Sequence, residues 1–174
     1  LSSDDEHKHY LTHNNDVNDE RYKKFLSNLM LPLIERMKLN SKGLDYGCGP
    51  GPALSLMLRE KGYQMFNYDP FFHPKKSNLL KKYDFISCSE TVEHFHNPFY
   101  EFTRFNELLN DGGIIGIMTN FHSKENIFEN WYYIKDPTHV VFYSKNTFLI
   151  IAKMFKWDCE FLNNNLVFFK KIYN

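Results

Sequence analysis

Two kinds of apolar pattern alternate along the chain. Apolar side chains that recur every three or four residues predict amphipathic helices, whereas short continuous apolar runs predict buried strands. The helical pattern covers 18–37, 52–61, 98–109 and 145–155, and the strand pattern covers 43–46, 63–68, 83–88, 114–119, 157–162 and 166–172.

Residues that start or stop helices agree with this division. Asn97 followed by Pro98 is typical of a capped helix start, and Ser144 can cap the last helix. Gly62 is typical of a residue just after a helix end. Pro32 lies inside the first helical pattern and predicts a kink or a break there.

Alternating strands and helices, followed by a terminal pair of strands, predict an α/β fold. The sheet is expected to be parallel over most of its width and to include an antiparallel last strand. With 174 residues and no evident linker, the chain is expected to form one domain, 1–174. Its polar residues 1–17 are expected to form an extended N-terminal arm.

The composition narrows the class of protein. Hydrophobic residues make up 43% and charged residues 24%, as in globular proteins, and no apolar run is long enough to span a membrane. Basic and acidic side chains number 21 each, so no nucleic-acid partner is expected. Three cysteines without metal-ligand spacing indicate a reducing, cytoplasmic environment and neither a disulfide framework nor a zinc site. The oligomeric state is left open.

A glycine-rich turn is the strongest chemical signal. Gly47, Gly49 and Gly51 follow the first strand and open a helix, so the backbone can turn sharply and approach a ligand closely. Asp69 ends the next strand, where a carboxylate can accept hydrogen bonds from a ribose diol. The spacing is GxGxG, not the GxGxxG of dinucleotide-binding dehydrogenases. Asp45, just before the loop, suits the ammonium group of a methionine moiety better than a pyrophosphate.

Four segments carry a family resemblance. LDYGCGPG (44–51) resembles the first motif of class I S-adenosylmethionine-dependent methyltransferases, and YDFISCSETVEHF (83–95) resembles their fourth-strand segment. LLNDGGIIGIMT (108–119) and DPTHVVFYSKNTF (136–148) resemble two later segments of the family. The resemblance covers residues 20–172, which is most of the chain. Within the family, the chain resembles bacterial stand-alone methyltransferase domains of unassigned substrate, which are similar to the quinone-biosynthesis methylases.

This resemblance implies a Rossmann-like methyltransferase fold, S-adenosylmethionine as cofactor and S-adenosylhomocysteine as product. We expect transfer of a methyl group to a small-molecule acceptor. Carried over to matching positions, the resemblance implies a cofactor site formed by Asp45, Gly47, Cys48, Gly49, Gly51, Asp69, Pro70, Phe71, Cys88, Ser89 and Glu90.

The chain departs from the family pattern after Asp69. Only thirteen residues, 70–82, separate it from the next strand, where the family has a helix, an edge strand and a second acidic contact to adenine. A helix and a strand together need about fifteen residues plus turns. We therefore expect a six-stranded sheet without the usual third strand. Four lysines of this segment either discourage pairing at the exposed edge or solvate a loop: Lys75, Lys76, Lys81 and Lys82.

Methyl transfer from a sulfonium requires positioning of the acceptor and, if the acceptor is protonated, a base. His94 and His139 are the candidate catalytic bases, because histidine titrates near neutral pH, and a structural role is the alternative for each. His7, His9 and His13 lack cysteine or carboxylate partners in the sequence, so no metal site is expected.

Two further segments have open roles. The arm residues Tyr10, Thr12 and Asn14 either fold over the cofactor or stay loose. An aromatic group in the last third of the chain forms either core or a wall for an apolar or planar acceptor: Phe128, Trp131, Tyr132, Tyr133, Phe142 and Tyr143.

Two other functions are weighed against methyl transfer: a Rossmann-type NAD(P)-binding oxidoreductase and a non-catalytic S-adenosylmethionine-binding module.

Overall fold

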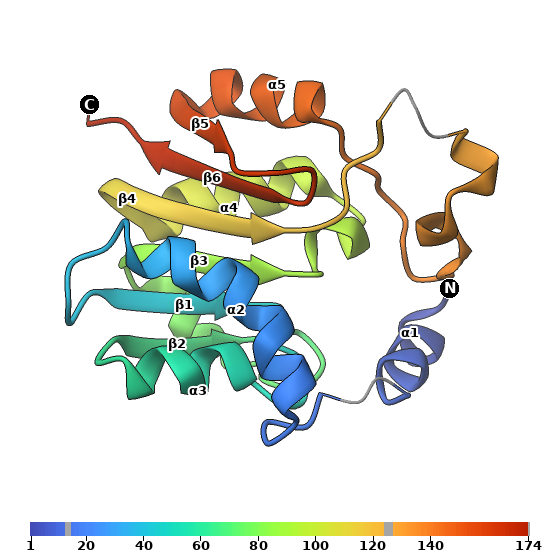
Figure 1. Ribbon diagram of the computed structural model, residues 1–174, viewed down its shortest axis with the longest axis horizontal. Helices are drawn as coiled ribbons and strands as arrows, with labels where there is room; N and C mark the ends of the chain where they lie inside the picture. Colours follow the sequence, from blue (N-terminus) through green and yellow to red (C-terminus); the bar gives the residue numbers. More distant parts are fainter. Residues whose placement is uncertain (13–14, 124–126, 174) are drawn as a thin grey trace.

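A computed structural model describes residues 1–12, 15–123 and 127–173 of the chain (Figure 1). His13 and Asn14 lie outside the described residues. Asn14 is one of the arm residues that were considered as part of a cover over the cofactor. The helices are α1 (Ser3–Tyr10), α2 (Glu20–Ile34), α3 (Ala53–Glu60), α4 (Pro98–Leu108) and α5 (Lys145–Phe155). The strands are β1 (Lys42–Tyr46), β2 (Gln64–Tyr68), β3 (Tyr83–Ser89), β4 (Leu109–Met118), β5 (Trp157–Phe161) and β6 (Leu166–Lys171). Short 3₁₀ helices are η1 (Lys76–Leu80), η2 (Val92–His94), η3 (Phe128–Asn130) and η4 (Tyr132–Lys135).

The strands form one six-stranded sheet in the order β2-β1-β3-β4-β6-β5. Neighbours among β1 to β4 pair in parallel, and β6 runs antiparallel to both β4 and β5. The predicted Rossmann-like α/β fold with an antiparallel last strand is therefore confirmed. No helix among the described residues is long and apolar enough to cross a membrane.

Helices cover both faces of the sheet (Figure 1). One cluster of buried residues joins α2 and α3 to the sheet through Leu29, Leu33 and Leu58, all fully buried. The other joins α4 and α5 to the opposite face through Phe105 and Phe148. The two apolar layers hold the carboxyl ends of the parallel strands at one edge of the molecule, where α/β folds place their ligands.

Local capping explains where the helices begin. Asn97 accepts a hydrogen bond from the Tyr100 amide at the start of α4, and Ser144 forms a reciprocal capping box with Thr147 at the start of α5. Pro32 lies in the last turn of α2, and the helix ends at Ile34. The helix therefore stops short of the predicted end at residue 37, and the amides of Arg36 and Met37 bond the carbonyls three residues before them, those of Leu33 and Ile34.

The extended conformation expected for the N-terminal segment is wrong, because Ser3–Tyr10 form a helix. The Ser2 hydroxyl caps the helix by accepting a hydrogen bond from the Asp5 amide. Acidic residues occupy the first turn and basic ones the last, which favours a helix through its macrodipole. Packing adds to this, since the His7 ring stacks on Phe71 with centroids 5.5 Å apart. The segment was expected to be extended because it is polar, and its capping and charge signals were not taken into account.

The absence of a further strand between Asp69 and Tyr83 is confirmed, since the structure describes that whole segment and leaves β2 at the sheet edge. The backbone carbonyls that point outward from β2 accept hydrogen bonds from side chains. Arg59 donates to the Met65 carbonyl at 2.9 Å, and Asn78 donates to the Asn67 carbonyl at 3.0 Å. These contacts occupy groups that could otherwise pair with another chain.

The four lysines of residues 70–82 contribute less to this edge than Arg59 and Asn78 do. The Lys81 ammonium lies 4.1 Å from the centroid of the Phe66 ring on β2. Lys82 donates to the Glu107 carbonyl, away from the edge strand. Lys75 and Lys76 are exposed. The edge is therefore protected mainly by hydrogen bonds to its carbonyls, and Lys81 adds a cation–π contact.

Candidate active site

A cavity of about 840 Å³ lies at the carboxyl ends of β1, β2 and β3. Its wall combines residues that are far apart in the sequence: the glycine-rich loop, the turn after β2, the segment after β3, and residues 132–139. Glu6 and Tyr10 of α1 also line it, and Figure 1 places α1 beyond the strand ends, alongside η4. The cavity wall includes these sequence-predicted residues: Gly47, Gly49, Asp69, Pro70, Phe71, Ser89, Glu90, His94 and His139.

The glycine-rich loop adopts a conformation that side chains would disturb. Gly47 and Gly49 have positive φ angles of 73° and 64°. A Cβ atom on Gly47 would lie 2.1 Å from Cγ2 of Thr91, so the loop packs directly on the segment after β3. A Cβ atom on Gly51 would lie 1.9 Å from the Asn15 carbonyl oxygen, which shows that the N-terminal segment also crosses the loop. The lack of space for a Cβ atom and the positive φ angles therefore both favour glycine in this loop.

Asp69 ties the loop to the turn after β2. Its Oδ2 accepts a hydrogen bond from the Gly49 amide at 3.0 Å, and its Oδ1 accepts from the amides of Phe71 and Phe72 at 2.9 and 3.0 Å. A carboxylate has roughly four acceptor positions, two on each oxygen. These three bonds leave one position, on Oδ2, for a ligand hydroxyl in the cavity.

Four of the expected cofactor contacts do not belong to the cavity wall: Asp45, Cys48, Gly51 and Cys88. Asp45 is buried on β1 and accepts a hydrogen bond from the Ser87 hydroxyl at 2.8 Å. Burial raises the pKa of Asp45 to about 7, although the bonds from Ser87 and the Ser55 amide act in the opposite direction. Cys88 is fully buried in the core, and burial also raises the pKa of the Cys48 and Cys88 thiols.

Two glutamates and a tyrosine form a buried network beside the cavity. The Tyr133 hydroxyl donates to Glu93 and contacts Glu90 at 3.1 Å, and the Thr119 hydroxyl donates to Glu93 at 3.0 Å. Burial raises the pKa of both carboxyl groups, and the charge of Glu90 raises that of Glu93 further. Glu90 has a positive φ of 45°, an uncommon value for a residue other than glycine.

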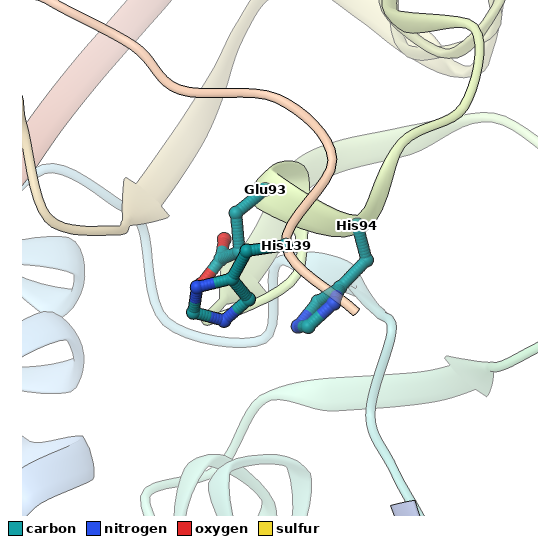
Figure 2. Close-up of side chains that lie close together, drawn as sticks. All are labelled: Glu93, His94 and His139. Atoms are coloured by element: carbon teal, nitrogen blue, oxygen red, sulfur yellow. The ribbon is translucent and has the colours of Figure 1, made fainter. Parts of the chain in front are cut away.

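His94 and His139 face each other across the cavity wall, with ring centroids 4.9 Å apart. The Nδ1 atom of His94 lies 3.0 Å from the Thr138 carbonyl, and that of His139 lies 2.7 Å from the Tyr133 carbonyl. Donation from Nδ1 to a carbonyl places the lone pair of a neutral imidazole on Nε2. Figure 2 shows that both rings and the Glu93 carboxylate point into the same space.

α1 is held over the cavity by contacts to three separate segments. Tyr10 packs against Phe71 and edge-on against His94, with ring centroids 5.4 and 5.3 Å apart. His9 lies 3.3 Å from the Asp136 carboxylate. Sequence reasoning did not assign Asp136, and it left open whether the N-terminal arm folds over the cofactor, because the partners of α1 lie in distant segments of the chain.

The aromatic segment divides between the two roles weighed for it. Tyr132 and Tyr133 line the cavity. Trp131 packs among other rings, including Phe128 with centroids 6.3 Å apart, and Tyr143 is buried in the core. Sequence reasoning did not assign further aromatic residues of the cavity wall, from α2, β1 and β2: Tyr22, Phe25, Tyr46 and Tyr68.

Solved structures confirm the fold. A protein from Pyrococcus horikoshii matches with a TM-score of 0.63 at 16% identity, covering 94% of this chain and 98% of that one. An S-adenosylmethionine-dependent methyltransferase from Archaeoglobus fulgidus matches at 0.61 with 20% identity, covering 81% and 73%. Phosphoethanolamine N-methyltransferase 2 from Haemonchus contortus, in complex with S-adenosylmethionine, matches at 0.53 with 17% identity, covering 76% of this chain and 37% of that one. No curated protein matches the sequence significantly.

The sheet order, the GxGxG loop and the carboxylate at the end of β2 define a Rossmann-like enzyme of the class I methyltransferase type. The chain belongs to the methyltransferase domain family, which it matches over residues 18–156. It is therefore an S-adenosylmethionine-dependent methyltransferase. The oxidoreductase and non-catalytic alternatives gain no support from these findings.

Proposed function

We propose that this methyltransferase modifies a small-molecule acceptor inside the cavity that α1 covers. The observation that carries the proposal is the size of the cavity together with its aromatic lining. A volume of about 840 Å³ falls in the range of roughly 300–1,000 Å³ typical of small-molecule sites. Aromatic side chains from several elements line it, which suits an apolar or planar acceptor. The three cysteines are free, in keeping with a cytoplasmic location.

The cofactor is proposed to lie along the loop between β1 and α3. Gly47 and Gly49 allow its close approach, and the remaining acceptor position on Asp69 receives a ribose hydroxyl. Pro70 and Phe71 then lie near the adenine, since they follow Asp69 in the cavity wall. Ser89 and Glu90 approach from the end of β3.

Four residues are proposed to support the cofactor site from outside the cavity wall. Asp45 and Cys88 lie within β1 and β3, below the strand ends, and Cys48 and Gly51 belong to the packed loop. The side chains of Asp45, Cys48 and Cys88, and the absence of one at Gly51, fix the position of the loop backbone.

The protein's part in the chemistry is to position the acceptor and to accept a proton where the acceptor carries one. S-adenosylmethionine supplies an activated methyl group, so no nucleophile from the protein is needed. His94 and His139 are the candidate bases, since each Nδ1 donates to a carbonyl and leaves the basic lone pair on Nε2. Their position in the cavity wall places them within reach of an acceptor.

Calorimetry with S-adenosylhomocysteine and NAD tests the cofactor assignment. We expect wild-type protein to bind S-adenosylhomocysteine and not NAD. Gly49→Val should weaken binding by at least about 100-fold, because a side chain at φ 64° would enter the space of the ligand and of Asn15. Isotope-labelled S-adenosylmethionine offered with pools of small metabolites would then identify the acceptor.

Gly62→Val is the matched control for this variant. Gly62 also has a positive φ, 89°, and a Cβ atom there would lie 3.1 Å from Leu39, a crowding similar to that at Gly49. Gly62 follows α3 at its far end from the cavity. Both variants should lose stability, but only Gly49→Val should lose the ligand. Equal affinity in Gly49→Val and wild type would show that the loop does not hold the cofactor.

A further inference from the structure

Three side chains with metal-binding atoms converge at the wall of the cavity. Glu93 and His94 come from η2, and His139 comes from the segment after η4. One carboxylate oxygen and one nitrogen from each imidazole all lie within 4.8 Å of one another. Figure 2 shows the three side chains directed into the same space. Ligands bound to one ion at about 2.1 Å are roughly 3.4 Å apart, a separation that small side-chain rotations would reach.

The hydrogen bonds around these residues match the surroundings of metal ligands. Histidines that bind a metal through Nε2 usually donate Nδ1–H to a carbonyl or carboxylate, which fixes the ring and its tautomer. His94 and His139 do so to the carbonyls of Thr138 and Tyr133. The carboxylate of Glu93 is likewise held, by hydroxyl groups of Thr119 and Tyr133.

The charge of the site also favours a cation. Glu93 is fully buried, and Glu90 lies beside it and shares the Tyr133 hydroxyl. Among the described residues, no lysine or arginine forms an ion pair with either carboxylate. Two carboxylates brought together inside a protein without a basic partner are costly unless a cation or shared protons compensate them.

We propose that Glu93, His94 and His139 bind one divalent first-row transition-metal ion, with Glu90 as the neighbouring carboxylate. Two imidazoles and a carboxylate are a ligand set that suits zinc, manganese, cobalt or iron better than magnesium or calcium. His94, His139 and Glu90 line the cavity, so the remaining coordination positions open toward it. The expectation of no metal site rested on the spacing of the three cysteines and on His7, His9 and His13, and this cluster consists of other residues.

The site has a consequence for the acceptor, which rests on the proposed function. An ion here would coordinate an oxygen of the acceptor and hold it at the cavity wall. Imidazole nitrogens that bind a metal cannot at the same time accept a proton, so metal binding and a base role exclude each other for His94 and His139. The acceptor class expected is therefore a compound with a hydroxyl or carboxylate oxygen.

Metal titration of chelator-treated protein tests the proposal. We expect Zn²⁺ and Co²⁺ to bind at one ion per chain by calorimetry, with Co²⁺ giving the visible absorption bands of a site with nitrogen ligands. Mg²⁺ and Ca²⁺ should bind far more weakly. His139→Gln and Glu93→Gln should each lower the Co²⁺ affinity roughly 100-fold. Loss of a residue that only hydrogen-bonds a metal ligand costs about 10- to 100-fold in metal affinity, and loss of a ligand itself should reach the upper end of that range. His73→Gln, outside the cavity wall, is the matched control and should bind as wild type does.

Each sample is also titrated with S-adenosylhomocysteine, which reports whether the variant is folded. Loss of Co²⁺ with retained S-adenosylhomocysteine binding in either variant supports the site. Wild-type protein that binds S-adenosylhomocysteine but takes up no ion overturns the metal site alone, as does Co²⁺ binding that is unchanged in both variants. Wild-type protein that binds Co²⁺ at this site but not S-adenosylhomocysteine upholds the site and contradicts the proposed function.

Discussion

Asp69→Ala is the substitution whose effect on cofactor affinity the structure defines most closely. From the sequence, the Asp69 carboxylate was expected to accept two hydrogen bonds from the ribose. In the structure, three backbone amides occupy three of its acceptor positions and leave one on Oδ2. One hydrogen bond to a charged acceptor contributes about 1.5–3 kcal/mol. The expected loss of S-adenosylhomocysteine affinity is therefore roughly 10- to 150-fold.

Asp69→Ala should also lower the free energy of unfolding, because the amides of Gly49, Phe71 and Phe72 lose their acceptor. We expect a cost of about 1–3 kcal/mol, measured by denaturant titration. Asp84→Ala is the control, since Asp84 also accepts from a backbone amide, that of Lys42, but is exposed and absent from the cavity wall. It should lose stability and keep its affinity. S-adenosylhomocysteine affinity within threefold of wild type in Asp69→Ala would refute the assignment of Asp69 to the ribose.

Two further predictions concern α1 and the buried acid of β1. Tyr10→Ala should speed release of S-adenosylhomocysteine several-fold in stopped-flow measurements, because it removes contacts to Phe71 and His94. Leu11→Ala, at an exposed position, is the control and should leave the release rate unchanged. Equal release rates for Tyr10→Ala and wild type would contradict the covering role of α1. Asp45 titrates at about 7 in the folded chain and at 3.8 in the unfolded one, so the folded state holds its proton longer and stability should fall as pH rises from 4 to 7. Asp45→Asn should remove up to about 4 kcal/mol of this pH dependence, and identical pH profiles for the two proteins would argue against a buried, protonated Asp45.

The strands were predictable because each combines a short apolar run with a clear boundary. β2 was expected at 63–68 and spans Gln64–Tyr68, and β5 was expected at 157–162 and spans Trp157–Phe161. β4 was expected at 114–119 and spans Leu109–Met118, so it begins directly after α4 and earlier than expected. Its pairing with β3 is interrupted between Leu109 and Ile114, where Gly112 has a positive φ of 75°. Regular parallel pairing with β3 starts again at Ile114, which is where the apolar run predicted the strand.

The candidate site was only partly predictable, because its polar residues meet through the fold. The glycine loop and Asp69 belong to one strand–helix–strand unit, so spacing alone identified them. His94 and His139 were each found as possible bases, but their proximity to each other and to Glu93 was not. The segment that carries His139 has no regular secondary structure at that residue, so no periodicity places it. The choice between an N-terminal arm that folds over the cofactor and a loose one stayed open for a similar reason, since the partners of the arm belong to distant segments.

Asp45 shows how the alternation of side chains along a strand sets the surroundings of a residue beside the glycine loop. It lies two residues before Gly47, and that proximity suggested contact with the cofactor. Side chains alternate between the two faces along a strand. Leu44 and Tyr46 belong to the cluster under α4 and α5, so Asp45 points to the opposite face, where α3 supplies the Ser55 amide. The Ser87 hydroxyl, from the neighbouring strand β3, donates a hydrogen bond to the Asp45 carboxylate. Asp45 therefore joins β1, β3 and the start of α3 beneath the loop, and its loss should alter stability more than S-adenosylhomocysteine affinity.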